Sequence, residues 1–266
     1  MDLPMIDEWI TARSRADLRG LSASDAVVAG GTWLFSQPQP NLRRLVDLTG
    51  LGWPDLTISD SGLEIAATCT IERLVTQGYP AAWRAGPLFA QCARALLASS
   101  KIWRSATVGG NLCLGLPAGA MISLCVALDG SAVIWRADGS EYVCAVSDFV
   151  RDIGITELES GDVLRAIRLP ASALTAETAM RKVAYAPLGR SGALVIGRRD
   201  ATGLHVSVTA ATRRPLVVEA PDSSGVMAAV TSLSDDEFHT DAHGRAEWRR
   251  AVTTRLAADV IGELAS

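Results

Sequence analysis

Two diglycine segments constrain most strongly what this chain can fold into. They are AGGTWL at residues 29–34 and ATVGGNL at residues 106–112, and each follows a short strand-like run. Glycine tolerates positive φ and carries no Cβ, so consecutive backbone N–H groups at such a turn can converge on an anion such as a phosphate. Neither segment fits the GxGxxG spacing or the GxxxxGKS/T spacing. A nucleotide bound by this chain would therefore be held by a fold other than the Rossmann or P-loop fold.

Each diglycine pair also has an ordinary interpretation as a tight turn. Two such pairs in one chain weaken that alternative. Thr32, Thr107 and Asn111 lie within the two segments and could add side-chain donors to a bound ligand. We therefore treat both segments as candidate cofactor-binding loops.

The composition is typical of a globular protein with a sizeable core. The 266 residues are 48% hydrophobic and 20% charged, with a formal net charge of −4. One to three compact subdomains fit this length. No basic cluster breaks the mildly acidic balance, so we expect no nucleic-acid partner.

Two further segments bear on where the protein works. Residues 1–20 lack the basic start and the apolar run of a signal peptide, which favours a cytoplasmic location. The longest apolar stretch, residues 112–128, is broken by Gly and Pro and is shorter than the roughly 20 residues that a bilayer span needs. We expect this stretch to be buried core, and we expect no membrane span.

Five cysteines are spread along the chain, at positions 69, 92, 113, 125 and 144. An odd number without a close pair supports neither a disulfide framework nor a CxxC metal site. We expect these residues to act as small buried hydrophobic side chains. We also expect the chain to carry no iron–sulfur cluster or other metal of its own.

Apolar periodicity and turn residues predict a succession of short helices and strands. Asp138-Gly139 between two extended runs is a clear hairpin signal, because this pair accepts positive φ. The predicted helices cover residues 5–18, 81–99, 117–128 and 244–264, and residues 50–60 are expected to be rich in turns. The predicted strands cover residues 26–29, 44–48, 63–69, 131–136, 141–145, 163–169, 179–185, 193–198, 204–211 and 216–219.

Both diglycine segments resemble the FAD-contacting signatures of the FAD-binding (medium) subunits of molybdenum hydroxylases, the family of xanthine dehydrogenase and carbon monoxide dehydrogenase. Further runs resemble the same family in the same order along the chain. They are LEIAA with TIERL at 63–74, GDVL to the Leu-Pro pair at 161–170, RKV with GRS at 181–191, and GRAEWR at 244–249. The resemblance spans nearly the whole chain and is therefore more specific than either diglycine segment.

The resemblance implies an α+β fold in three parts. Residues 1–54 and 55–175 would form the two FAD-binding subdomains of the vanillyl-alcohol-oxidase (PCMH) type, with FAD between them. Residues 176–266 would form a C-terminal domain with a three-stranded antiparallel sheet and helices. A compositional break near residues 171–178 agrees with the second boundary.

The resemblance also assigns contacts with FAD, and it assigns no catalytic or metal-binding residue. The pyrophosphate would lie against the first segment, and the second segment would contact the cofactor from the other subdomain. Lys182 aligns with a family lysine near the isoalloxazine ring, where its charge would stabilise the anionic reduced flavin. The alternative for Lys182 is a solvated lysine at a strand edge. The implied FAD contacts are Val28, Ala29, Gly30, Gly31, Thr32, Trp33, Leu34, Thr107, Gly109, Gly110, Asn111 and Lys182.

One short run departs from the family pattern. Where the family commonly has Ser-Pro-Ala-Ala-Asp after the second signature, this chain has Leu-Pro-Ala-Gly-Ala at residues 116–120. Leu116 and Ala120 thus replace a hydroxyl and a carboxylate. We expect hydrogen bonds to the sugar part of FAD to be missing and the isolated chain to hold FAD less tightly.

The resemblance implies an electron-transfer subunit of an oxidoreductase complex. A large molybdopterin-binding partner would hydroxylate the substrate, a small partner with two iron–sulfur clusters would relay electrons, and FAD on this chain would pass them to NAD, oxygen, a quinone or another carrier. Two alternatives stay open. One is a flavin reductase of the amino-sugar reductase type, which the runs at 181–191 and 244–249 disfavour. The other is a scaffold subunit that has lost FAD, suggested by Leu116 and Ala120.

Overall fold

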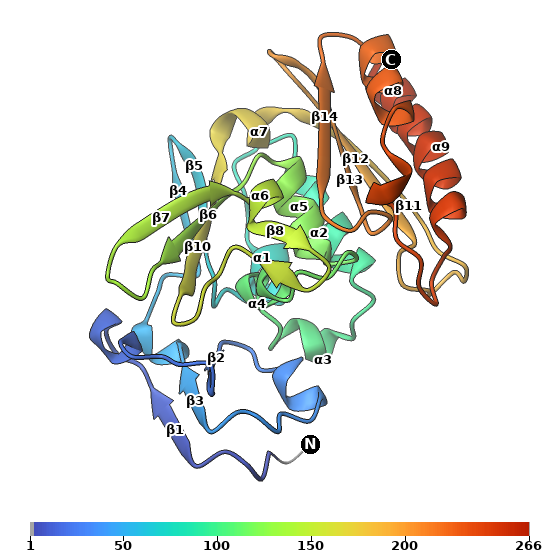
Figure 1. Cartoon of the computed structure of the whole chain (residues 1–266). Helices are drawn as coiled ribbons and strands as arrows, with labels where there is room; N and C mark the ends of the chain where they lie inside the picture. Colours follow the sequence, from blue (N-terminus) through green and yellow to red (C-terminus); the bar gives the residue numbers. More distant parts are fainter. Residues whose placement is uncertain (1–2, 266) are drawn as a thin grey trace.

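Four β-sheets organise the part of the chain that the computed structural model describes, residues 3–265 (Figure 1). The first has three parallel strands in the order β1-β3-β2, with β1 at Glu8–Thr11, β2 at Asp25–Val28 and β3 at Arg44–Asp47. Three short 3-10 helices accompany it, η1 (Arg15–Leu18), η2 (Leu34–Ser36) and η3 (Thr49–Leu51). The strands predicted at 26–29 and 44–48 are confirmed as β2 and β3.

The helix predicted over residues 5–18 is wrong. Residues 8–11 instead form β1, whose Trp9 lies opposite Leu45 of β3. The apolar spacing of this segment resembles a helix, but pairing with β3 satisfies its backbone groups, and long-range pairing outweighs local propensity. Trp9 stacks on Phe35, with 6.4 Å between ring centroids.

The second sheet has five antiparallel strands in the order β4-β5-β10-β6-β7. The predicted hairpin is confirmed as β6–β7, and Gly139 in its turn has a φ of 92°. The turn-rich segment 50–60 contains a strand that was not predicted, because β4 pairs with β5 through Leu56 opposite Ile65. The strands are β4 (Leu56–Ser59), β5 (Gly62–Ala66), β6 (Ser131–Trp135), β7 (Glu141–Ala145) and β10 (Val163–Pro170).

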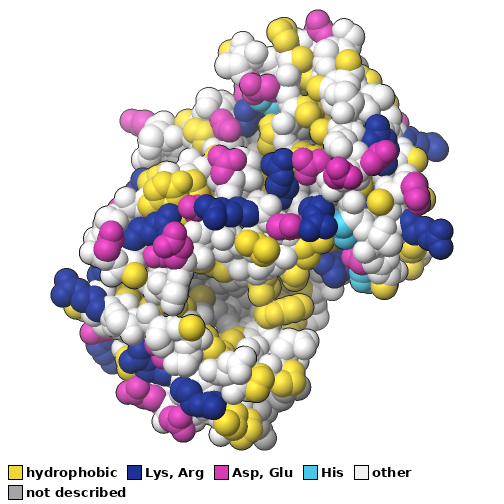
Figure 2. Space-filling view, in the orientation of Figure 1, with side chains coloured by type: hydrophobic (Ala, Val, Ile, Leu, Met, Phe, Trp, Pro, Cys, Tyr) yellow, Lys and Arg dark blue, Asp and Glu magenta, His cyan; other side chains and the backbone are white. Residues whose placement is uncertain are grey.

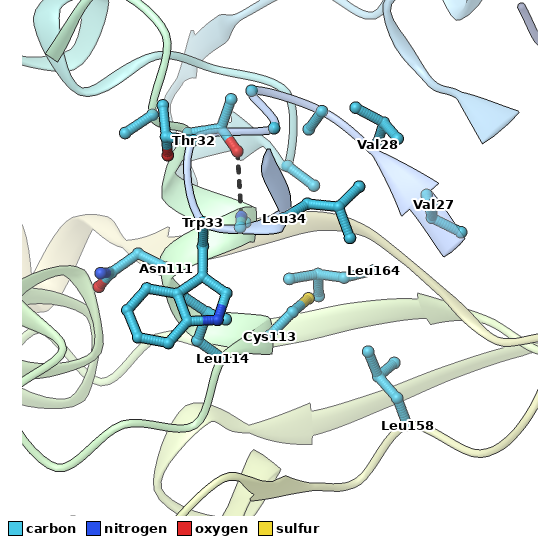
Figure 3. Close-up of a pocket in the computed structure, with 18 of the residues that line it drawn as sticks. Val27, Val28, Thr32, Trp33, Leu34, Asn111, Cys113, Leu114, Leu158 and Leu164 are labelled. Atoms are coloured by element: carbon cyan, nitrogen blue, oxygen red, sulfur yellow. Dashed lines mark hydrogen bonds between the residues drawn. The ribbon is translucent and has the colours of Figure 1, made fainter. Parts of the chain in front are cut away.

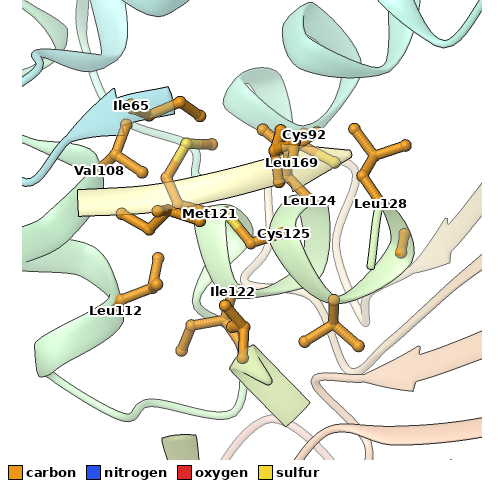
Figure 4. Packing of buried hydrophobic residues seen from close by; sticks show 14 of the residues in the cluster. Ile65, Cys92, Val108, Leu112, Met121, Ile122, Leu124, Cys125, Leu128 and Leu169 are labelled. Atoms are coloured by element: carbon orange, nitrogen blue, oxygen red, sulfur yellow. The ribbon is translucent and has the colours of Figure 1, made fainter. Parts of the chain in front are cut away.

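Short helices cover this sheet and build the main core. All eight residues of α5 (Ala120–Ala127) are buried, which explains why Ser123 is the one polar residue in this part of the sequence. Figure 4 shows side chains of α5 packed among residues of α2, α4, β5 and β10. The other elements of this region are α1 (Ile71–Thr76), α2 (Gly86–Ala95), α3 (Ser100–Trp103), α4 (Val108–Cys113), α6 (Val146–Phe149), α7 (Ala171–Thr175) and the two-stranded pair β8 (Val150–Asp152) and β9 (Ile155–Thr156).

The C-terminal sheet has four antiparallel strands, β11 (Glu177–Val183), β12 (Ala193–Asp200), β13 (Gly203–Thr209) and β14 (Leu216–Ala220), and not the three that the resemblance implied. The extended run predicted at 216–219 is the fourth strand, paired with β13 through Val218 opposite Val206. Helices α8 (Ser223–Thr231) and α9 (Ala246–Ala265) pack against this sheet, with η4 (Asp235–Glu237) before α9 (Figure 1). On the other side, the hydroxyls of Ser123 in α5 and Thr209 in β13 are 2.7 Å apart.

No helix within residues 3–265 combines the length and the apolarity that crossing a bilayer requires. All five cysteines are free thiols, three of them buried.

Candidate functional site

A cavity of about 910 Å³ opens between the N-terminal sheet and the second sheet with its helices (Figure 2). One wall comes from β2 and the loop after it, which carries the first diglycine segment. The opposite wall comes from α4, which carries the second segment, and from the chain that leads on to α5. A third wall, residues 158–164 before and within β10, was not predicted. The size is near the upper end of the range for small-molecule sites.

The first diglycine segment offers unpaired backbone donors to this cavity. Within the described chain, the four amides of residues 30–33 donate to no protein acceptor. Gly31 has a φ of 65°, and Trp33 two residues later has helical angles, so the chain turns from a left-handed to a right-handed conformation. Successive free N–H groups at such a turn can converge on an anion. The prediction of exposed N–H groups is confirmed for this segment.

The loop is held in place by close packing. A Cβ on Gly30 would lie 1.7 Å from the carbonyl oxygen of Ser105, and a Cβ on Gly31 would lie 2.4 Å from the Phe35 ring. The carbonyl oxygen of Gly31 accepts a hydrogen bond from the Phe35 amide at 2.9 Å. The first segment therefore rests directly on the chain that enters the second.

In the second diglycine segment, the amides of residues 108–110 all donate within the protein. The amide of Val108 donates to Cys69 O at 2.9 Å and that of Gly109 to Ala67 O at 3.1 Å. The amide of Gly110 donates to Thr107 Oγ1, 3.0 Å away, because Thr107 caps α4. The prediction of exposed N–H groups is therefore wrong for residues 108–110, since the carbonyls of Cys69 and Ala67 and the Thr107 hydroxyl already accept them.

The two glycines of this segment serve different purposes. A Cβ on Gly109 would lie 2.5–2.6 Å from atoms of Ala67, so this glycine permits α4 to touch the chain after β5. A Cβ on Gly110 would meet only Thr107 Oγ1 within 4 Å, and Gly110 is exposed where it lines the cavity. A side chain at 110 would thus occupy ligand space.

Asn111 presents a defined donor to the cavity. Its Oδ1 accepts a hydrogen bond from the Met121 amide at 2.9 Å, at the start of α5. A backbone N–H can only donate, so the side-chain oxygen must face it and the NH₂ group is left for a ligand. Figure 3 shows Asn111 beside Trp33 at one end of the cavity.

Apolar side chains form most of the remaining surface, among them Val27, Leu158 and Leu164 at the other end of the close-up (Figure 3). Cys113 is exposed to the cavity, but the surrounding wall desolvates its thiol and raises its pKa to about 12. This thiol is therefore neutral at physiological pH. Arg190 is the one basic side chain among the described residues that line the cavity.

The structure brings together eleven of the twelve residues proposed as FAD contacts. Lys182 lies half-buried on β11 and is not among the residues that line the cavity. Its place beside the ring stays a prediction. The residues that do line it are Val28, Ala29, Gly30, Gly31, Thr32, Trp33, Leu34, Thr107, Gly109, Gly110 and Asn111.

The segment that departs from the family pattern borders the same space. Leu116 and Gly119 line the cavity, and Ala120 is 1% exposed and does not. The loosened retention of FAD expected from this segment stays a prediction.

The residues present suit a flavin nucleotide. Four free amides suit a pyrophosphate, apolar walls suit flat rings, and the missing side chain at Gly110 leaves space beside them.

Comparison with known proteins agrees with these features. The sequence profile described as the FAD binding domain in molybdopterin dehydrogenase matches residues 5–172. No match to this sequence exists among the curated proteins searched.

Solved structures share the fold over almost the full chain. A chain of the reconstituted CO dehydrogenase from Oligotropha carboxidovorans superposes with a TM-score of 0.82 at 21% identity, covering 98% of both chains. A chain of the CO dehydrogenase from Hydrogenophaga pseudoflava that lacks the Mo-pyranopterin moiety of its molybdenum cofactor superposes with a TM-score of 0.81 at 21% identity. The match again covers 98% of both chains. A chain of quinoline 2-oxidoreductase from Pseudomonas putida 86 superposes with a TM-score of 0.80 at 20% identity, covering 99% of this chain and 98% of that one.

Proposed function

This chain belongs to the family of FAD-binding domains of molybdopterin dehydrogenases, and from that premise we propose that it is the electron-transfer subunit of a molybdenum hydroxylase complex. Its cofactor is FAD and it is an oxidoreductase component. The observation that carries the proposal is the cavity in which the free amides of residues 30–33 face the α4 segment. The family match over residues 5–172 favours this role over an amino-sugar reductase.

The chain's own groups would divide the work of holding the cofactor. The amides of residues 30–33 would bind the pyrophosphate, and the Asn111 NH₂ group would donate to the cofactor from the opposite wall. The apolar walls exclude water, which strengthens these polar contacts. When bound, FAD supplies an acceptor for electrons from a one-electron relay and a donor to a two-electron carrier. We keep Lys182 as a candidate stabiliser of the reduced ring.

The partners and boundaries belong to the same proposal. We propose a large molybdopterin-binding subunit and a small iron–sulfur subunit as partners, supported by the matched CO dehydrogenase and quinoline 2-oxidoreductase chains. The acceptor would be NAD, oxygen, a quinone or another carrier. We propose subdomains at 1–54, 55–175 and 176–266, and the profile match ends close to the second boundary. The free thiols of all five cysteines support a cytoplasmic location.

Purification of the native complex tests this function. We expect this chain to co-purify with the two partners and with about one FAD per chain. Gly110→Val should place a side chain in the cavity and remove FAD. Gly262→Val is a matched control, because Gly262 likewise lies in a helix but away from the cavity. No neighbouring atom of the described chain lies within 4 Å of a Cβ added at Gly262. After anaerobic reduction with dithionite, clusters in the wild-type and Gly262→Val complexes should pass electrons to an acceptor, and those in the Gly110→Val complex should not.

A wild-type complex that releases no FAD on denaturation would support the scaffold alternative and contradict the proposal. Full flavin in Gly110→Val would show that the cofactor does not occupy this cavity. Oxidation of an organic substrate by this chain alone would contradict the assigned role.

A further inference from the structure

Three carboxylates line the cavity, and they differ in how many hydrogen bonds they already accept. Asp25 accepts from Arg44 Nη2 at 2.7 Å and Nε at 3.0 Å, and from both the amide and the hydroxyl of Ser22. Its acceptor sites are therefore filled by the protein.

The acceptor sites of the Asp162 carboxylate are also filled by the protein. It accepts from Arg136 Nη1 at 2.6 Å, from the Ala137 amide at 3.0 Å and from the Glu159 amide at 3.0 Å, and the residue is 8% exposed. Its role is to tie the loop before β10 to the β6–β7 hairpin.

Glu159 is the carboxylate with spare acceptor capacity. Among the described residues its carboxylate forms a single ion pair, a long contact of 3.9 Å with Arg136, and its side chain is 81% exposed. Its backbone is nevertheless fixed, because its own amide donates to Asp162. The wall thus presents a solvated carboxylate, with acceptor sites free for a ligand, on an anchored stretch of backbone.

The surroundings of Glu159 suit a nucleoside. Leu158 beside it and Val27 on β2 are apolar and lie on the side of the cavity away from Trp33 and Asn111 (Figure 3). Val27 also precedes the loop whose free amides suit the pyrophosphate. A base between these apolar side chains would bring its sugar between the phosphate and Glu159. A carboxylate is the usual acceptor for the hydroxyls of a nucleotide ribose.

We propose that Glu159 accepts hydrogen bonds from the 2′- and 3′-hydroxyls of the adenosine sugar of FAD. It does so in place of the hydroxyl and carboxylate that Leu116 and Ala120 lack. This inference rests on the proposed function, because it names a contact with the same cofactor.

The flavin-free full chain, titrated with FAD and with its 2′-deoxyadenosine analogue, provides the test. Wild type should bind the analogue several-fold more weakly than FAD, whereas Glu159→Gln should bind FAD about tenfold more weakly and discriminate little between the two ligands. Glu141→Gln is the matched control, since Glu141 is an exposed carboxylate on β7 that does not line the cavity. This control should behave like wild type with both ligands.

Three outcomes overturn the inference. Unchanged FAD affinity in Glu159→Gln would show that the carboxylate makes no contact. An equal loss for both ligands, with wild-type discrimination retained, would show a general disturbance of the loop. Failure of every variant and of wild type to bind FAD would remove the proposed function itself, and this contact with it.

Discussion

The two diglycine segments look equivalent in the sequence and differ in the structure. The first leaves the amides of residues 30–33 free at the cavity, whereas the amides of residues 108–110 in the second all donate within the protein. The first segment therefore supplies donors. The second supplies close packing at Gly109, open space at Gly110 and one side-chain donor at Asn111.

A glycine pair therefore does not by itself specify an anion site. A helix start leaves backbone amides without partners inside the helix, and at the start of α4 the turn after β5 and the Thr107 hydroxyl accept those of residues 108–110. What the second segment shares with the first is the absence of Cβ atoms where two parts of the chain meet, at Gly30 on Ser105 and at Gly109 on Ala67.

The largest expected effect comes from separating the two glycines of the second segment. Gly109→Ala should lower the free energy of unfolding of the flavin-free chain by about 2 kcal/mol, because the new methyl group overlaps atoms of Ala67 that cannot move freely. Gly110→Ala should leave that free energy unchanged or raise it by up to about 1 kcal/mol, since alanine favours a helix. Chemical denaturation of both flavin-free variants measures the difference.

Flavin titration completes this comparison. Gly110→Ala should bind FAD more weakly than wild type despite its retained stability, because its methyl group enters the cavity. Equal stability of the two variants would contradict the packing role of Gly109. Unchanged FAD affinity in Gly110→Ala would contradict the spatial role of Gly110.

A smaller effect should follow when the one donor of the second segment is removed. Asn111→Asp retains an oxygen for the Met121 amide but loses the NH₂ group, so FAD affinity should fall about tenfold with little change in stability. Asn111→Ala should lose both contacts, and its unfolding free energy should also fall by about 1 kcal/mol. Wild-type FAD affinity in Asn111→Asp would show that only the first segment donates to the cofactor.

The smallest expected effect is on thermal stability at acid pH. Hydrogen bonds from Arg44 hold the pKa of Asp25, on the strand before the first segment, below its ordinary value. A lowered folded-state pKa contributes stability that is present above the unfolded value of about 4 and is lost as pH falls through the folded value. Asp25→Asn should lower the melting temperature by about 2 °C at pH 7 and by less below pH 4.

The measurement is thermal unfolding of wild type and Asp25→Asn across this range. A gap between the two proteins that widened in acid would have the wrong sign and would contradict the role given to this ion pair. Asp60→Asn controls for the loss of a carboxylate, because Asp60 is exposed, its side chain has no hydrogen bond or ion pair among the described residues, and it does not line the cavity.

Local chemistry in the sequence determined several features of this protein. Asp138-Gly139 specifies the β6–β7 turn because glycine alone accepts its φ of 92° without strain. The sequence of α5, apolar except for Ser123, specifies burial on every side. The same reasoning found both diglycine segments, which now face one cavity. These features depend on residues close together in the chain.

Tertiary structure decided the rest, because the deciding partners are distant in sequence. Residues 8–11 became a strand by pairing with β3, and β14 became the fourth strand of the C-terminal sheet by pairing with β13. Residues 158–164 form a cavity wall, and the hydrogen bond that Arg136 donates to Asp162 holds this wall in place. The carbonyls of Cys69 and Ala67 accept hydrogen bonds from the amides of Val108 and Gly109 in the second diglycine segment. No protein acceptor of the described chain reaches the amides of residues 30–33 in the first. A backbone amide binds a ligand only if folding brings no other acceptor to it, and no local pattern of residues records which acceptors will arrive.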